Sequence, residues 1–147
     1  MVLLAALAAA CGQKAGTAEA PPAATVAALP LKPGYYVASD IPCAEASNAT
    51  TMLVTRTGIN GSRTFCRFTQ IEKTGATTYR ATSECSDGGE AWGHEETVDT
   101  STSIYEIPDE TRFRVTYEGG SDFEARFCEQ STMAPGFRDN DISGLIG

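Results

Sequence analysis

The single histidine of the chain, His94, is the first residue whose type and setting could do chemistry. It opens the stretch HEETV, residues 94–98, which begins like the zinc-binding pattern His-Glu-x-x-His. That pattern needs a second imidazole as its fifth residue, and Val98 cannot ligate zinc. A hydrolytic triad has no support either, because the sequence contains no Gly-x-Ser-x-Gly elbow. We expect His94 to be a solvated loop residue and the chain not to be an enzyme.

Carboxylates near the C-terminal end offer a second chemistry, the binding of calcium. The stretch DNDISG, residues 139–144, matches the opening half of an EF-hand loop. Such a loop needs a bidentate carboxylate at its twelfth position, and the sequence counted from Asp139 ends at the ninth. Most other carboxylates fall in Gly-rich or Thr-rich stretches, which are typical of solvated groups without a raised pKa. We therefore predict no metal, no cofactor and no acid–base pair.

The distribution of charge says more about partners than about catalysis. The chain has 19 acidic and 11 basic side chains, a net charge of −8, and no lysine or arginine between Arg80 and Arg112. The acidic residues in or beside that gap are Glu84, Asp87, Glu90, Glu95, Glu96, Asp99, Glu106, Asp109 and Glu110. A negative field repels phosphates, which excludes nucleic acid as the expected partner. Plain solubility is the explanation of this charge that we favour, and a basic protein is the kind of partner that it would suit.

A tryptophan lies in the same region, within the glycine-rich stretch SDGGEAWGHEE, residues 86–96. Trp92 either plugs one end of a barrel, which is the interpretation we favour, or anchors a partner, as aromatic residues often do at interfaces. The candidate partner surface consists of Trp92, Glu95, Glu96 and Asp99.

The N-terminal residues predict export. Residues 1–10, MVLLAALAAA, are apolar but shorter than the roughly 20 residues that span a bilayer, and they end in small residues typical of a signal-peptide cleavage site. Cys11-Gly12 follows directly. This arrangement resembles the lipobox of bacterial lipoproteins, in which the cysteine is lipidated and becomes the new N-terminus. Ala8 replaces the usual leucine, and the basic residues that normally precede the apolar run are missing. A start codon further upstream would account for the second departure.

The resemblance implies a place in the cell. Gln13 rather than aspartate follows Gly12, which in lipoproteins of the enterobacterial type implies an outer-membrane protein facing the periplasm. The alternative is an ordinary secretory signal that leaves Cys11 as a free thiol on a secreted or soluble periplasmic protein. The Ala/Pro-rich residues 11–33 are typical of a flexible tether. We expect a β-domain over residues 34–130 and a loosely packed tail over residues 131–147.

Four further cysteines fit an exported, disulfide-held domain. Setting Cys11 aside leaves Cys43, Cys66, Cys85 and Cys128, an even number that predicts two disulfides. We favour the pairs Cys43–Cys66 and Cys85–Cys128. The main alternative pairs Cys66 with Cys85 across a hairpin. A zinc site is not expected, since no two cysteines have close C-x-x-C spacing.

The elements that must position these residues are strands. Residues 63–85 form the clearest unit, two strands joined by a turn at Gly75, with Tyr79 and Ala81 on one face of the second strand. In the first strand Phe65 and Ile71 share one face while Phe68 lies on the other, a pattern typical of a strand that is central in its sheet or covered on both sides.

Further strands follow with short connections and no amphipathic helix. They are expected at residues 35–37, 52–57, 97–107 (one or two exposed strands), 112–117 and 123–128, with a turn at residues 58–61. The pattern predicts a single all-β domain: an antiparallel meander of seven or eight strands, forming a barrel or a strongly bent sheet.

Two classes of function fit such a domain. The first is a non-enzymatic envelope lipoprotein whose β-domain binds a protein or is structural. A sharper version rests on TGATTY, residues 74–79, which resembles the Ser-Gly-x-x-Tyr loop of membrane-bound c-type lysozyme inhibitors, with one extra residue before the tyrosine. The resemblance implies an acidic, eight-stranded barrel that inhibits lysozyme or another basic enzyme. That family's second, tryptophan-containing motif has no counterpart here, so no residue roles are carried over.

The second class is a lipocalin-like carrier with an apolar cavity. It is disfavoured because Phe65, Phe113, Phe123 and Phe127 are expected to fill a small barrel.

Overall fold

The structure is a computed structural model that describes residue 16 and residues 22–147, without the side chain of Trp92. The predicted signal peptide (residues 1–10) and Cys11 lie outside the described residues. Within the described ranges no helix is both long enough and apolar enough to cross a membrane.

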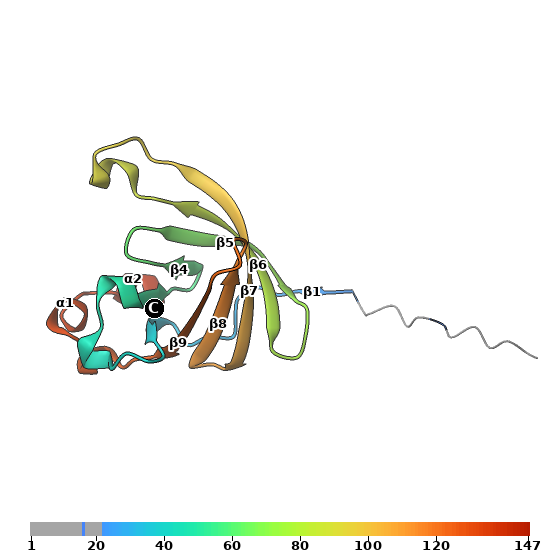
Figure 1. Cartoon of the computed structure of the whole chain (residues 1–147), viewed down its shortest axis with the longest axis horizontal. Coiled ribbons are helices and arrows are strands. Elements are labelled where there is room, and N and C mark those ends of the chain that lie inside the picture. Colours follow the sequence, from blue (N-terminus) through green and yellow to red (C-terminus); the bar gives the residue numbers. More distant parts are fainter. Residues whose placement is uncertain (1–15, 17–21) are drawn as a thin grey trace, which may run out of the picture.

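The chain folds into an antiparallel meander of eight strands that closes into a barrel, as the sequence predicted (Figure 1). Each strand pairs with the next along the chain, and the last pairs with the first. The barrel strands are β2 (Gly34–Ala38), β3 (Thr51–Val54), β4 (Gly58–Asn60), β5 (Phe65–Lys73), β6 (Thr78–Ser86), β7 (Val98–Asp109), β8 (Arg112–Tyr117) and β9 (Asp122–Phe127). A ninth, two-residue strand, β1 (Ala24–Thr25), pairs with the end of β5. All pairings are antiparallel, so connections can be short.

The helical segments are short and lie outside the barrel. They are the 3₁₀ turns η1 (Cys43–Glu45), η2 (Asn48–Thr50), η3 (Gly89–Trp92) and η4 (Gln130–Thr132), and the single-turn helices α1 (Pro135–Arg138) and α2 (Ser143–Ile146).

Aromatic side chains fill the barrel interior. The ring of Tyr36 lies 5.2 Å from that of Phe113 and 5.7 Å from that of Phe127, measured between centroids. Tyr105 packs between Phe113 and Phe68. The Tyr36 hydroxyl hydrogen-bonds the carbonyl oxygens of Lys32 (3.0 Å) and Glu110 (2.8 Å), so this buried polar group is satisfied. Burial raises the pKa of both Tyr36 and Tyr105, which keeps both phenols neutral.

Strand β5 contains a bulge, so the side chains on its two faces differ from those that the sequence predicted. The register against β6 shifts between Phe68 and Gln70, so one extra residue reverses the alternation of the strand. Phe68 and Ile71 therefore both pack in the barrel core. Phe65 is 49% exposed instead of filling the interior, so β5 is not covered on both faces. It is a central strand, as the other alternative predicted, because it pairs with both β4 and β6.

Two other elements differ from the sequence predictions. Residues 58–60, expected to form a turn, are strand β4, and the turn comes later, where the amide of Gly61 donates to the carbonyl of Thr64 (2.7 Å). β7 is a single strand of 12 residues, and Tyr105 and Ile107 on it are buried, so it is not simply an exposed strand.

Part of the expected tether belongs to the folded domain. Leu29 and Leu31 are 7% and 8% exposed and pack in the barrel core, and Ala24 in β1 pairs with Lys73. The tether prediction is therefore wrong for residues 24–33. Leu29 and Leu31 stand among prolines and show neither a helical nor a strand period, so the sequence did not indicate that they are buried.

The tail prediction is also wrong. Met133 and Ile142 are 3% and 4% exposed and form a second apolar cluster with Tyr35 and Val37 on the outer face of β2. Residues 131–147 thus cover one flank of the barrel, and Figure 1 shows α1 and α2 grouped at one side of it.

The four expected cysteines form two disulfides, Cys43–Cys128 and Cys66–Cys85. The pairs favoured from the sequence, Cys43–Cys66 and Cys85–Cys128, are therefore wrong. The main alternative, which paired Cys66 with Cys85, is confirmed. Cys66 and Cys85 are directly opposite in the β5–β6 register. Closure of the barrel brings the end of β9 beside β2, where the amide of Cys128 donates to the carbonyl of Tyr35 (2.9 Å), and this places Cys128 within reach of Cys43.

Candidate functional site

The connection between β6 and β7 forms a projection from the barrel. We call residues 87–97 the acidic tip, because they include Asp87, Glu90, Glu95 and Glu96 and no lysine or arginine. The ladder of β6 and β7 continues to the pair Ser86–Val98, so the two strands carry the tip past the barrel (Figure 1).

Asp87 organises the acidic tip from its base. Its Oδ1 accepts hydrogen bonds from the amides of Gly89 (2.9 Å) and Thr97 (3.2 Å), and its Oδ2 accepts one from the Thr97 hydroxyl (3.0 Å). The bonds from the Gly89 and Thr97 amides, followed by that from the Thr97 hydroxyl and the nearby charge of His94, lower the pKa of Asp87. The ionised side chain therefore joins the two ends of the loop.

Two glycines allow the chain to turn after Asp87. Gly88 and Gly89 both have positive φ, 74° and 25°. A Cβ on Gly89 would come within 2.2 Å of the backbone of Glu96, so this position requires glycine for space as well as for conformation. Ser86 adds a further tie, since its hydroxyl hydrogen-bonds the Glu96 carboxylate and accepts from the Gly88 amide (3.1 Å).

Both ring nitrogens of His94 face acceptors within the acidic tip. Nδ1 lies 2.7 Å from the carbonyl oxygen of Glu95. A carbonyl oxygen can only accept a hydrogen bond, so Nδ1 is the donor. Nε2 lies 3.6 Å from Oδ2 of Asp87. Neither nitrogen is thus directed at a serine hydroxyl. Among the described residues no group of three or more histidine, cysteine or carboxylate side chains is placed to hold a metal ion.

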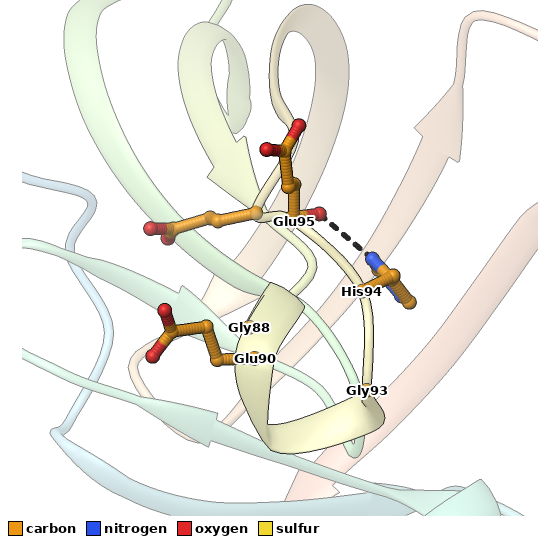
Figure 2. Close-up of a pocket in the computed structure, with 6 residues that line it drawn as sticks. Gly88, Glu90, Gly93, His94 and Glu95 are labelled. Carbon is orange, nitrogen blue, oxygen red and sulfur yellow. Dashed lines mark hydrogen bonds between the residues drawn. The ribbon is translucent and has the colours of Figure 1, made fainter.

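An open depression of about 830 Å³ lies in the acidic tip. It is lined by Gly88, Glu90, Gly93, His94, Glu95 and Glu96. Figure 2 shows the side chains of Glu90 and His94 extending to different sides of the loop. The depression is an open, negatively charged surface that includes two glycines. Such a surface suits contact with a macromolecule better than the binding of a single small ligand.

The structure brings together some of the predicted partner surface. Glu95 and Glu96 line the depression, whereas Asp99 lies on β7 opposite Cys85, just below it. The side chain of Trp92 lies outside the described part of the structure, so its predicted role remains a prediction. Sequence reasoning missed the organising role of Asp87, which the dipeptide Asp-Gly at residues 87–88 signals as a turn.

Comparison of the chain with protein-family models, curated proteins and solved structures finds no match in any of the three.

Proposed function

We propose that the chain is a non-enzymatic lipoprotein of the bacterial envelope whose β-barrel binds a basic protein through the acidic tip. The observation that carries this proposal is the tip itself: a projecting loop with four carboxylates, stiffened by the hydrogen bonds of Asp87. Complementary charge accelerates association and suppresses wrong partners. A loop that is already ordered also loses less conformational entropy on binding.

Several acidic side chains of the barrel wall are paired with arginines, in contrast to two carboxylates of the tip. On the barrel wall, Arg114 pairs with Glu124 (2.7 Å) and Arg80 with Glu72 (2.8 Å), which balances charge locally. The carboxylates of Glu90 and Glu95 have no basic partner within residues 22–147. Their charge is available to a partner.

The contents of the barrel argue against the carrier alternative. Tyr36, Phe113 and Val115 are at most 1% exposed and occupy the interior that an apolar ligand would need. The surroundings of His94 argue against an enzyme, because both ring nitrogens face acceptors within the loop.

Inhibition of a basic enzyme such as c-type lysozyme is the second candidate. The eight-stranded barrel and the two disulfides support it, since the lysozyme-inhibitor resemblance implies such a barrel. The TGATTY loop, residues 74–79, lies at the opposite end of β5 and β6 from the acidic tip. Inhibition through that loop and binding through the tip would therefore use different ends of the barrel.

The test is a titration of c-type lysozyme with the purified oxidised protein, following both binding and lytic activity. We expect binding that weakens as salt rises and that weakens further in the double variant Glu90→Gln/Glu95→Gln. The matched control is Glu45→Gln/Glu118→Gln, which removes the same charge from exposed positions outside the tip. Inhibition that survives the tip variant but not Tyr79→Ala would favour the TGATTY loop. Equal effects of the two double variants would contradict a role for the tip.

A further inference from the structure

A second cavity, separate from the depression in the acidic tip, lies on the flank of the barrel where the C-terminal tail meets β3 and β4. Its volume is about 280 Å³, close to the lower end of the range for small-molecule sites. The tail closes one side of it: the carbonyl of Leu145 accepts a hydrogen bond from the amide of Arg56, between β3 and β4 (3.3 Å). The cavity is therefore built from segments distant in sequence.

No charged side chain lines this cavity, although the chain carries a net charge of −8. The wall combines aromatic rings with amides and hydroxyls, chiefly those of Tyr35, Phe65, Phe137, Asn48, Asn60 and Thr51. A neutral wall with flat apolar faces and several hydrogen-bonding groups matches a neutral ligand that has one apolar face and a polar edge.

The polar groups at the rim are available to a ligand. The side chains of Asn48, Asn60 and Ser62 make no hydrogen bond to any described residue. The side-chain amides of Asn48 and Asn60 each carry donors and an acceptor, so each can either donate a hydrogen bond to a ligand hydroxyl or accept one from it. Phe65 beside them is 49% exposed, so its ring is accessible to a ligand.

One residue that lines the cavity, Thr51, has a buried polar atom without a partner. Thr51 is 8% exposed, and its Oγ1 is the one buried side-chain oxygen or nitrogen in the described structure that makes no hydrogen bond. Because this oxygen is enclosed by protein atoms, the polar contacts to a ligand fall to the side chains at the rim.

The aromatic wall is held in place before any ligand binds. The Tyr35 hydroxyl accepts a hydrogen bond from the Asn140 side chain (2.9 Å) and keeps its own proton to donate. Its ring meets that of Phe137 edge to face, with centroids 5.4 Å apart. Gln130 fixes the intervening loop by donating to the carbonyls of Phe137 (2.9 Å) and Asn140 (2.6 Å).

From this combination we propose that the cavity binds one neutral sugar unit of a glycan. The apolar face of the pyranose ring packs on Phe65, and its hydroxyl or acetamido groups bond Asn48 and Asn60. Aromatic stacking with amide hydrogen bonds suits a sugar, whereas a lipid would leave the amides unpaired and an ionic ligand would find no counter-charge. The site does not depend on the function proposed for the acidic tip.

The experiment is a titration of the oxidised protein, labelled with ¹⁵N, with oligosaccharides of N-acetylglucosamine and, separately, of glucose. We expect one series to give saturable amide shifts at Asn48, Asn60 and Phe65 at millimolar concentration or below. Phe65→Ala is expected to weaken that binding about tenfold, in keeping with the size of an aromatic contact. Asn60→Ala should weaken it as well.

Matched controls separate loss of binding from loss of fold. Ile104→Ala is the control for Phe65→Ala, because it also removes an exposed apolar side chain (38% exposed). Gln70→Ala is the control for Asn60→Ala, because it removes a side-chain amide from an exposed position on β5. Both are expected to bind the sugar normally, with all variants checked by thermal melting. The proposal is overturned if neither series gives saturable shifts, if the shifts cluster elsewhere, or if a neutral peptide binds the cavity and the sugars do not. The tip variant Glu90→Gln/Glu95→Gln should bind sugar unchanged, so failure of one proposal is distinguishable from failure of the other.

Discussion

Asp87 and Thr97 join the two ends of the acidic tip through two hydrogen bonds, one to the Thr97 amide (3.2 Å) and one to its hydroxyl (3.0 Å). The same carboxylate receives the Gly89 amide, so one side chain organises a loop of eleven residues, from 87 to 97. A short polar side chain that bonds the backbone two residues on is a common way to fix a turn.

Replacing Asp87 is expected to loosen the tip without unfolding the barrel. In Asp87→Ala the amides of Gly89 and Thr97 lose their acceptor, so their hydrogen exchange should accelerate while the melting temperature changes little. Asp87→Asn keeps an oxygen for both amides and should show an intermediate effect. Hydrogen exchange followed by NMR measures the difference, and unchanged protection in Asp87→Ala would contradict the assigned role.

The carboxyl group of Asp109 is expected to titrate at low pH. The Thr111 hydroxyl (2.6 Å) and then Arg112 hold its pKa at about 2, below the value of about 3.9 for an unperturbed aspartate. Because the folded pKa is depressed, the stability that this group contributes is complete above about pH 4 and is lost as the pH falls towards 2.

Carboxyl-detected NMR titration measures the pKa of Asp109 directly. Thr111→Val removes the hydroxyl but keeps the amide donor (2.9 Å), so the midpoint should rise towards the ordinary value. Thr116→Val on β8 is the control and should leave it unchanged. A wild-type midpoint near 3.9 would show that the hydrogen bonds do not hold the carboxylate as described.

The two disulfides are expected to stabilise the protein unequally. Cys43–Cys128 closes 85 residues and Cys66–Cys85 only 19. On the chain-entropy argument these loops contribute roughly 4.6 and roughly 3.2 kcal/mol. Denaturant unfolding should therefore show a larger loss for Cys43→Ala/Cys128→Ala than for Cys66→Ala/Cys85→Ala. The opposite order would mean that packing around the bonds outweighs loop length.

Truncation of two phenylalanines should separate the core from the surface. Phe113 is 1% exposed, and Phe113→Ala is expected to cost about 3–5 kcal/mol of unfolding free energy. Phe65 is 49% exposed, and Phe65→Ala should cost no more than about 1 kcal/mol. Equilibrium unfolding measures both. A large loss in Phe65→Ala would show that this ring supports the fold and would disqualify it as a probe of the cavity.

Local alternation predicted the strands well. In β8, Phe113 and Val115 face the core while Arg112 and Arg114 face solvent. The sequence alternates between apolar and polar residues in the same way, so it predicted this strand. The bulge in β5 left no such signal, because Thr69 resembles any other exposed strand residue. One inserted residue was enough to send Phe65 to the surface.

Long-range contacts explain the remaining errors. Cys43 meets Cys128 only because β9 returns to β2, and local sequence does not specify which strands close a barrel. The acidic tip was partly predictable, since Glu95 and Glu96 stand in an obvious charge run. The flank cavity was not, because Thr51 and Phe65 become neighbours of the tail only after Met133 and Ile142 pack against β2.

The N-terminal strand β1 and the acidic tip lie at opposite ends of the β5–β6 hairpin. β1 joins β5 at Lys73, whereas the acidic tip follows Ser86 at the other end of β6. Nine residues of strand separate these ends, roughly 27 Å at about 3.4 Å per step. Phe65 pairs with Ser86 and therefore lies at the same end of the hairpin as the tip. Both candidate sites thus share the end of the barrel that is opposite the N-terminal strand, and one large partner could contact them together.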